Sequence, residues 1–281
     1  MRLSPRLLLA AVLTVGPTSL LLPAAADETQ TAETATAEPA AAQSAAEQAA
    51  LPPVGEALSV KALEAELIKR VEELGTHVAD EEAFEAASEM KWNKACGVIA
   101  CIGQALSQHP EGHTAKGDKL AIRDAALALA EAGDAEEAKG LLDPLGEAMT
   151  VPGTVYVDSP DAAEPSGDDW YSLIESYYLM QEINDRNAAL VKIMRRPRGT
   201  AEEAANAAVM ALLCYPMHAQ AEDYVEEEDL AGYRMLTVEN LTAAGELAET
   251  ILKRDRRGVK AGVLATQKSC QQCHKQYRDG E

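Results

Sequence analysis

The pattern of apolar and polar positions along this chain is helical almost throughout. In its clearest stretch, apolar or small side chains recur at alternating steps of three and four residues. They are Leu230, Tyr233, Thr237, Leu241, Ala244, Ala248 and Ile251. Such a stripe covers one face of a helix and suits an antiparallel bundle. No long segment alternates with the period of two that a half-buried strand requires, so the pattern predicts an all-α protein.

Proline and glycine divide this pattern into eight predicted helices. Pro110 with Gly112 and Pro197 with Gly199 mark two of the stops. The helices are expected near 58–75, 80–108, 117–133, 134–149, 170–195, 200–225, 229–255 and 257–279. They fall into two groups of four, which predicts two four-helix-bundle-like domains, one over residues 56–150 and one over residues 170–281.

The first 26 residues have the composition of a secretory signal peptide. Arg2 and Arg6 precede a short apolar run, and small residues lead up to Ala26. A transmembrane anchor is the alternative, for which the run is short and interrupted. We therefore expect cleavage near Ala26 and Asp27 and a periplasmic or otherwise extracytoplasmic protein without stable membrane insertion.

Two further segments lack the apolar residues needed for a core. Residues 27–55 are rich in Ala, Thr, Glu, Gln and Pro, which predicts a disordered tether. Residues 151–169 are rich in proline, glycine and aspartate, which predicts a linker between the two domains.

Composition and charge narrow the classes of partner. The chain has one Phe, 4% aromatic residues and a formal net charge of −21. A field of this sign does not attract nucleic acid or an anionic membrane, and it favours basic partners besides keeping the protein soluble. Abundant Ala, Leu and Glu agree with a helical chain.

The segment "KSCQQCHKQYR" near the end of the chain carries candidate chemistry. Cys270, Cys273 and His274 form a C-x-x-C-H sequence, the attachment motif of a c-type haem. Two thiols add to the porphyrin vinyl groups as thioethers, and the adjacent imidazole binds the iron. The spacing places these side chains on the face of the helix that also carries its apolar stripe. The residues along this face are Val259, Val263, Thr266, Cys270, Cys273, His274 and Tyr277.

Other readings of a C-x-x-C pair fit the sequence less well. A thioredoxin-type redox pair belongs near a βαβ pattern, and a structural zinc site needs a second pair of ligands at matching spacing. Neither feature is present in the sequence. A disulfide remains an alternative, because the predicted compartment permits one.

A terminal helix that ends in C-x-x-C-H-x-x-Y-R, as the last of four in an exported bundle, resembles the cytochrome c prime family of class II c-type cytochromes. Cys270, Cys273 and His274 match the family's haem-attachment and proximal positions, and Tyr277 and Arg278 match the residues that follow. The resemblance covers residues 170–281 and, weakly, the first group of helices. It implies one covalent haem c inside the bundle, which binds nitric oxide or carbon monoxide or carries electrons.

The resemblance also places the distal side of the haem on the first helix of the second domain. The candidates there are Leu179, Met180, Ile183 and Leu190, of which Met180 is the weak favourite, although a Met at helical spacing more often belongs to a core. Arg278 either meets a haem propionate or is a cation at a helix C-terminus. The connection at Glu226–Asp229 is shorter than the family's, and Pro216 should kink the preceding helix.

The two groups of helices resemble distant copies of each other. At an offset of 113, Asn206 and Cys214 correspond to Asn93 and Cys101. Composition alone can also make Ala-rich helices alike. If the repeat is real, the first copy ends before the position of the haem motif.

The remaining cysteines and histidines favour no second site. Cys96 and Cys101 lie five apart and point to different faces of their helix, and small buried apolar residues are the simplest interpretation. Cys214 is able to pair with Cys101, which leaves one thiol free or paired with another chain in a homodimer. The other histidines, which are His77, His109, His113 and His218, are scattered.

These features predict an exported monohaem cytochrome that binds a small gas or transfers electrons to a redox protein. The alternative from another class is an interaction or sensor protein, in which the first bundle docks a partner and the haem is structural. A haem enzyme such as a peroxidase ranks third, because no distal acid–base pair is visible.

Overall fold

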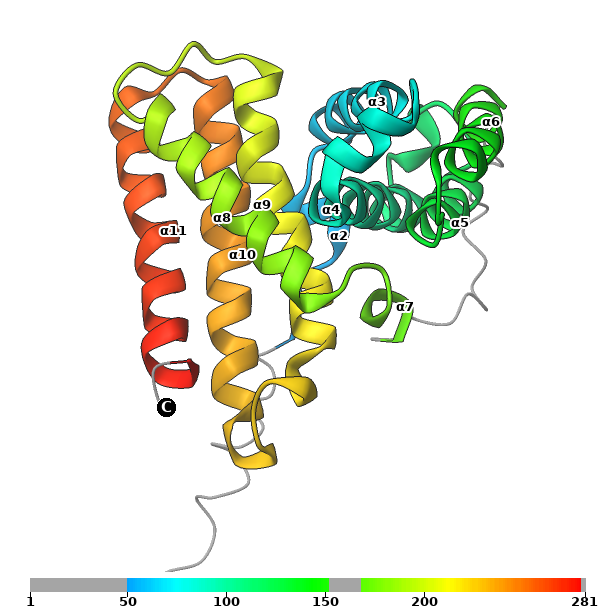
Figure 1. Ribbon diagram of the computed structural model, residues 1–281. Helices are drawn as coiled ribbons and strands as arrows, with labels where there is room; N and C mark the ends of the chain where they lie inside the picture. Colours follow the sequence, from blue (N-terminus) through cyan, green and yellow to red (C-terminus); the bar gives the residue numbers. More distant parts are fainter. Residues whose placement is uncertain (1–49, 152–167, 279–281) are drawn as a thin grey trace, which may run out of the picture. The chain divides into compact units, whose positions relative to one another are not determined.

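The computed structural model describes residues 50–151 and 168–278 (Figure 1). Within these ranges the chain is helical and has no strand, which confirms the all-α prediction. The predicted signal peptide, most of the tether and most of the linker lie outside the described residues. Among the helices that are described, none combines the length and apolar character needed to cross a bilayer.

The helices follow the predicted order within one compact unit, and the predicted linker divides them, by position in the chain only, into a first and a second group. The first group contains α2 (Val54–Ala57), α3 (Val60–His77), α4 (Glu81–Gln108), η1 (Gly112–Thr114), α5 (Lys119–Ala130) and α6 (Ala135–Thr150). The second contains α7 (Asp168–Tyr171), α8 (Ser176–Ile193), α9 (Ala201–Ala219), η2 (Ala221–Asp223), η3 (Glu227–Asp229), α10 (Leu230–Leu252) and α11 (Arg256–Tyr277). Val54 at the end of the predicted tether is buried.

Side-chain caps explain where several helices begin. Asp80, Asp118 and Asp134 accept hydrogen bonds from the backbone amides of Ala83, Ala121 and Glu137 at 2.8, 3.1 and 2.8 Å. Asp255 does the same for Arg257 and Gly258 at the start of α11. Each cap satisfies a donor in the first helical turn that has no partner within the helix.

The helix predicted near 170–195 is interrupted in the structure. It consists of α7 and α8, which are separated by the segment 172–175. The side-chain amide of Gln220 donates hydrogen bonds to the carbonyl oxygens of Tyr171 and Ile174 at 2.7 and 2.8 Å. These carbonyl groups are thus satisfied by the residue that follows α9, and Leu173 and Ile174 are buried at the break.

Two helices, α4 and α9, are the most deeply buried of the part described. Almost every side chain of α9 from Glu203 to Met217 is buried, and α4 is buried without interruption from Cys96 to Leu106. A helix that is apolar on all sides belongs at the centre of a packed group. Accordingly, α9 contacts α3, α4, α8 and α10, while α4 contacts α3, α5, α8 and α9.

Helices α8, α9, α10 and α11 pack in sequence, and α11 returns to contact α8 (Figure 1). The predicted stripe of α10 faces the interior, since Tyr233, Thr237 and Leu241 are buried. The predicted face of α11 is confirmed as well, because Val259, Val263 and Thr266 are buried and line up with the C-x-x-C-H segment. Pro216 lies inside α9, which ends at Ala219 rather than near 225.

Candidate functional site

The C-x-x-C-H segment opens on a cavity of about 810 Å³. This volume lies within the range of pockets that hold small molecules and cofactors. The cavity is bounded by α8, α10 and α11, with contributions from α9 and the residues after it. Its lining consists of Ser176, Tyr177, Met180, Gln181, Ile183, Asn184, Asn187, Met217, Tyr224, Tyr233, Leu236, Asn240, Ser269, Cys270, Cys273, His274, Tyr277 and Arg278.

The α11 side of the cavity carries both thiols and the imidazole of the motif. Cys270, Cys273 and His274 are each partly buried and all line the cavity. Burial raises the pKa of Cys270 and raises that of Cys273 to about 11, the neighbouring Cys270 adding to the effect. Both thiols are therefore neutral at physiological pH and need an activating reaction partner.

A second part of the cavity wall is formed by α8, between Ser176 and Asn187. Met180 and Ile183 line the cavity from this helix. Leu179 and Leu190, the other two distal candidates, are fully buried and are absent from its lining. The structure thus brings two of the four candidates to the cavity. It adds the thioether of Met217 from α9, which sequence reasoning missed.

A cluster of three tyrosines forms the end of the cavity near the C-terminus of α11. Tyr233 stacks on Tyr224 with ring centroids 5.8 Å apart and meets Tyr277 edge-on at 5.5 Å. Burial raises the pKa of Tyr224 to about 12 and raises that of Tyr233 further. Gly232 permits this packing, because a Cβ atom there would lie 2.5 Å from the Tyr277 hydroxyl oxygen.

Three buried polar atoms of the lining have no hydrogen-bond partner. They are Asn187 Oδ1, Tyr233 OH and Asn240 Oδ1. Tyr233 and Asn240 are only 3% and 4% exposed, so bulk water reaches them poorly. A buried polar group without a partner costs about 1 to 3 kcal/mol. The lining therefore fits an occupant that is largely apolar and has a few polar groups.

Arg278 also borders the cavity. Its side chain is exposed, and it has no ion-pair partner among the residues that the structure places. Its backbone amide donates to the carbonyl oxygen of His274 at 2.9 Å, as expected at a helix C-terminus. This position suits both predicted roles, the pairing with a propionate and the interaction with the helix dipole.

The three remaining cysteines are buried and unpaired. Cys96, Cys101 and Cys214 are free thiols, so the disulfide considered between Cys101 and Cys214 is not formed. Burial raises the pKa of Cys96 to about 12 and raises the pKa values of Cys101 and Cys214 further. Their burial agrees with their interpretation as small core residues.

The scattered histidines have local roles where their contacts are known. His109 Nε2 donates to the carbonyl oxygen of Leu58 at 3.0 Å, and its Nδ1 accepts from the amide of Glu111 at 2.9 Å. His113 Nδ1 lies 3.1 Å from the carbonyl oxygen of Pro110. Over residues 50–151 and 168–278, no group of three or more His, Cys, Asp or Glu side chains is arranged to hold a metal ion.

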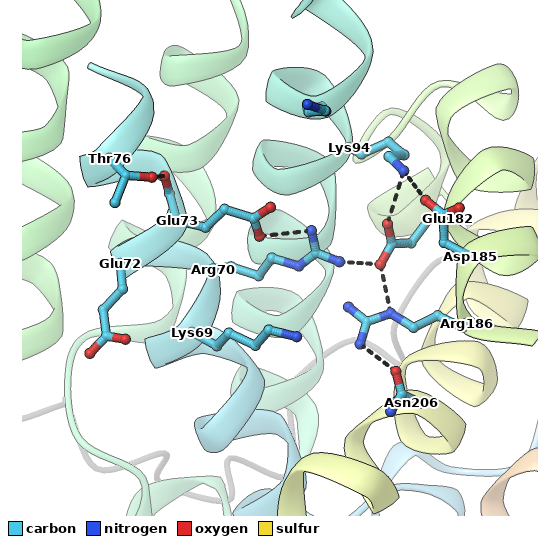
Figure 2. A pocket seen from close by; sticks show the side chains of 11 residues that line it. Lys69, Arg70, Glu72, Glu73, Thr76, Lys94, Glu182, Asp185, Arg186 and Asn206 are labelled. Atoms are coloured by element: carbon cyan, nitrogen blue, oxygen red, sulfur yellow. Dashed lines mark hydrogen bonds and ion pairs between the residues drawn. The ribbon is translucent and has the colours of Figure 1, made fainter. Parts of the chain in front are cut away.

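A second cavity, of about 580 Å³, lies beside a network of charged residues from α3, α4 and α8 (Figure 2). Arg70, Lys94, Glu182 and Arg186 are among its lining. It contains no cysteine or histidine, so it offers neither thioether attachment nor an imidazole ligand. The cavity at the C-x-x-C-H segment is the stronger functional candidate.

Comparison of the chain with models of known families, with curated proteins and with solved structures finds no match. The functional assignment therefore depends on the residues of the cavity. Of these, the sequence predicted Cys270, Cys273, His274, Met180 and Arg278. It gave no signal for Met217, the tyrosine cluster or the unpartnered amides, whose meeting depends on the packing of four helices.

Proposed function

We propose that this protein is an exported monohaem c-type cytochrome of the cytochrome c prime type. One haem c would be attached through Cys270 and Cys273, with His274 as the iron ligand on the α11 side. The observation that carries the proposal is that these three side chains line one largely apolar cavity among four helices. A C-x-x-C-H sequence on an exposed, unsupported helix would lack the apolar walls that a porphyrin needs.

The other lining residues suit the same group. Ile183, Leu236 and the tyrosine rings supply apolar surface for the porphyrin. The unpartnered Oδ1 atoms of Asn187 and Asn240 are acceptors and are available to water beside the propionates, whereas the unpartnered Tyr233 hydroxyl is able to donate to a carboxylate. Arg278 is placed to pair with a propionate carboxylate. When bound, the haem iron supplies reversible one-electron chemistry and binding of small diatomic ligands.

We favour binding of nitric oxide or carbon monoxide as the function. The side chains that α8 contributes to the cavity lining are mostly apolar or neutral amides. No imidazole other than that of His274 lines the cavity in the part of the chain described. With His274 as its only protein ligand, a haem iron held here would be able to bind a small diatomic gas.

Electron transfer is the second candidate, because two thioethers line the same cavity. Met180 on α8 and Met217 on α9 are both in the lining, and a Met ligand raises the reduction potential of a haem. In that case the partner would be a redox protein, and the chain's charge of −21 favours a basic one.

The proposal extends to the organisation of the whole chain. The second group of helices would be the haem-binding four-helix bundle, and the first a haem-less bundle of related fold. A signal peptide over residues 1–26 would export the chain to the periplasm, where haem is attached to c-type cytochromes. The signal peptide and the covalent haem are linked expectations, since attachment needs the exported chain.

An absorption spectrum of the purified protein with and without carbon monoxide separates the two functions. The protein is produced with a cytochrome c maturation system and reduced before the gas is added. We expect a high-spin reduced spectrum that changes on addition of carbon monoxide. A low-spin spectrum that does not change would favour electron transfer, and Met180→Leu and Met217→Leu would then identify the sixth ligand.

A further inference from the structure

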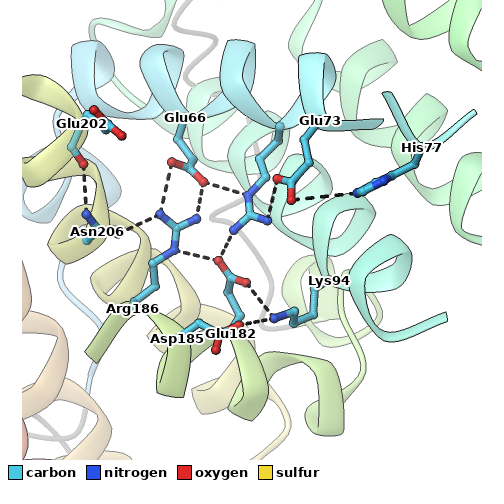
Figure 3. A network of polar contacts seen from close by, with 10 residues as sticks. Glu66, Glu73, His77, Lys94, Glu182, Asp185, Arg186, Glu202 and Asn206 are labelled. Atoms are coloured by element: carbon cyan, nitrogen blue, oxygen red, sulfur yellow. Dashed lines mark hydrogen bonds and ion pairs between the residues drawn. The ribbon is translucent and has the colours of Figure 1, made fainter. Parts of the chain in front are cut away.

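A buried network of four charged side chains joins α3 to α8 (Figure 3). Within α3, Arg70 Nε donates to Glu66 Oε1 at 2.8 Å, and within α8, Arg186 Nε donates to Glu182 Oε1 at 2.7 Å. Between the helices, Arg70 donates to Glu182 and Arg186 donates to Glu66. Glu66 and Glu182 are each 1% exposed, so the pairs are shielded from solvent.

This network is reciprocal. Helices α3 and α8 both contain 18 residues, and in each the glutamate is the seventh residue and the arginine the eleventh. The arginine of each helix binds the glutamate of the other, so the two helices cross in antiparallel directions. Reciprocal contact of equivalent residues is the property of an interface between two copies related by a two-fold axis.

The surrounding helices follow the same rule. Helix α3 packs against α9, the helix that follows α8, and α8 packs against α4, the helix that follows α3. The two central helices carry fully buried cysteines, Cys101 and Cys214, at the offset of 113 found in the sequence. Aligning Lys139 of α6 with Lys260 of α11 gives an offset of 121, and at this offset α6, which ends at Thr150, stops before the position of His274.

Helix α8 separates this network from the haem cavity. Glu182 and Arg186 point from α8 toward α3, whereas Met180, Ile183 and Asn187 line the cavity. Burial works to raise the pKa of Glu66, but Arg186 and Arg70 outweigh it and lower that pKa. The carboxylate is therefore charged and paired when α8 is in place.

We infer that the first group of helices is a haem-less copy of the second, that it docks on α8 as a second subunit would, and that it thereby fixes the α8 wall of the cavity. The first group is thus an internal partner, and its α3 face is occupied within the chain. The effect on a bound haem rests on the proposed function, whereas the docking itself does not.

A cycle of charge reversals in the full chain tests this inference. The double substitution of Glu66→Arg with Arg70→Glu exchanges the positions of the two charges on α3. The double substitution of Glu182→Arg with Arg186→Glu does the same on α8. Each pair keeps its contact within the helix and turns both contacts between helices into repulsions, and the combined variant restores all of them. Because Glu73 contacts Arg70 and Lys94 contacts Glu182, Glu73→Gln and Lys94→Gln are present in every member, the reference included.

The stability and the dynamics of α8 are the primary measurements. Each reversed variant should lower the Tm by roughly 10 °C, as when buried ion pairs are broken in a chain of this size, and the combined variant should recover most of the loss. Amide exchange in residues 176–193 should accelerate by about tenfold or more in each reversed variant and return in the combined one. The exposed pair of Glu249 and Lys253 serves as the matched control, whose reversal should leave both quantities unchanged.

Carbon monoxide binding to the same variants then tests the effect on the cavity. The rate or affinity should change severalfold in the variant reversed on α3, which does not border the cavity, and should return in the combined variant. Unequal Tm losses in the two reversed variants, or no recovery in the combined one, would overturn the inference that the first group of helices docks on α8 as an internal partner. If the Tm and the amide exchange recover in the combined variant but the affinity for carbon monoxide is the same in all variants, the inferred effect of docking on the cavity would be overturned. Absence of haem would refute the proposed function, but the Tm and the amide exchange of the variants would still decide whether the first group docks on α8.

Discussion

The unpartnered hydroxyl of Tyr233 gives a prediction whose sign depends on whether the cavity is filled. Tyr233→Phe removes one oxygen atom and leaves the ring contacts with Tyr224 and Tyr277 in place. In the chain without haem, this hydroxyl is buried and lacks a partner. Its removal should raise the free energy of unfolding by about 1 kcal/mol, at the lower end of the cost of an unpartnered buried group.

In the haem-loaded protein the same substitution should lower the free energy of unfolding. If a polar group of the occupant satisfies the hydroxyl, the loss is about 0.5 to 1.5 kcal/mol, or more for a charged acceptor. Urea unfolding of both forms, followed by far-ultraviolet circular dichroism, measures the two changes. The slope with urea should be unaltered, so that the shift in midpoint reports stability.

Tyr215→Phe is the matched control for this experiment. Its hydroxyl donates to the carbonyl oxygen of Pro52 at 3.0 Å, outside the cavity, so its loss should destabilise both forms alike. Destabilisation of the haem-free chain by Tyr233→Phe would refute the reasoning, because it would mean that the hydroxyl already has a partner, such as water. An equal stabilisation of both forms would show that the occupant leaves Tyr233 unsatisfied.

Three further predictions follow from the same contacts. Met180→Leu should leave the spectrum of the reduced protein without carbon monoxide unchanged if the iron is five-coordinate, because Leu preserves the apolar wall; a loss of low-spin character would instead show that the thioether is a ligand. Glu66→Gln should make the stability less sensitive to acid. The pKa of Glu66 is lowered in the folded state, so its contribution to stability is complete above its usual pKa of 4.5 and is lost as the pH falls below that value. The Tm should therefore fall less between about pH 5 and 3 in the variant than in the unaltered protein. In the haem-free chain at pH 8, a maleimide should label the partly buried Cys270 and Cys273 slowly, because their pKa values are raised, and should leave the fully buried Cys96, Cys101 and Cys214 unlabelled until urea is added, with mass spectrometry of peptides as the assay.

The helices could be predicted from the sequence because their determinants are local. Four helices begin at a capping aspartate, which is Asp80, Asp118, Asp134 or Asp255. The apolar positions predicted for α10 and α11 lie on the buried faces of these helices. The break between α7 and α8 could not be predicted, since it depends on the amide of Gln220, the residue that follows α9.

Only part of the candidate site could be predicted from the sequence. Cys270, Cys273 and His274 are adjacent in sequence, and their spacing alone places them on one face of a helix. Met217 and Tyr233 come from other helices, so only tertiary packing brings them to the cavity. The glutamate and arginine of α3 and α8 are visible as pairs four residues apart, but that pattern usually forms within one exposed helix. Their exchange of partners between helices is a property of the fold.

The central claim is that one haem is covalently attached at the C-x-x-C-H segment. The most direct test is the intact mass, under denaturing conditions, of the chain produced with a cytochrome c maturation system. We predict the mass of the processed polypeptide plus one haem, and the loss of that addition when Cys270 and Cys273 are both replaced by Ala. A mass equal to the polypeptide alone, or a haem addition that persists in the double variant, would contradict the assignment.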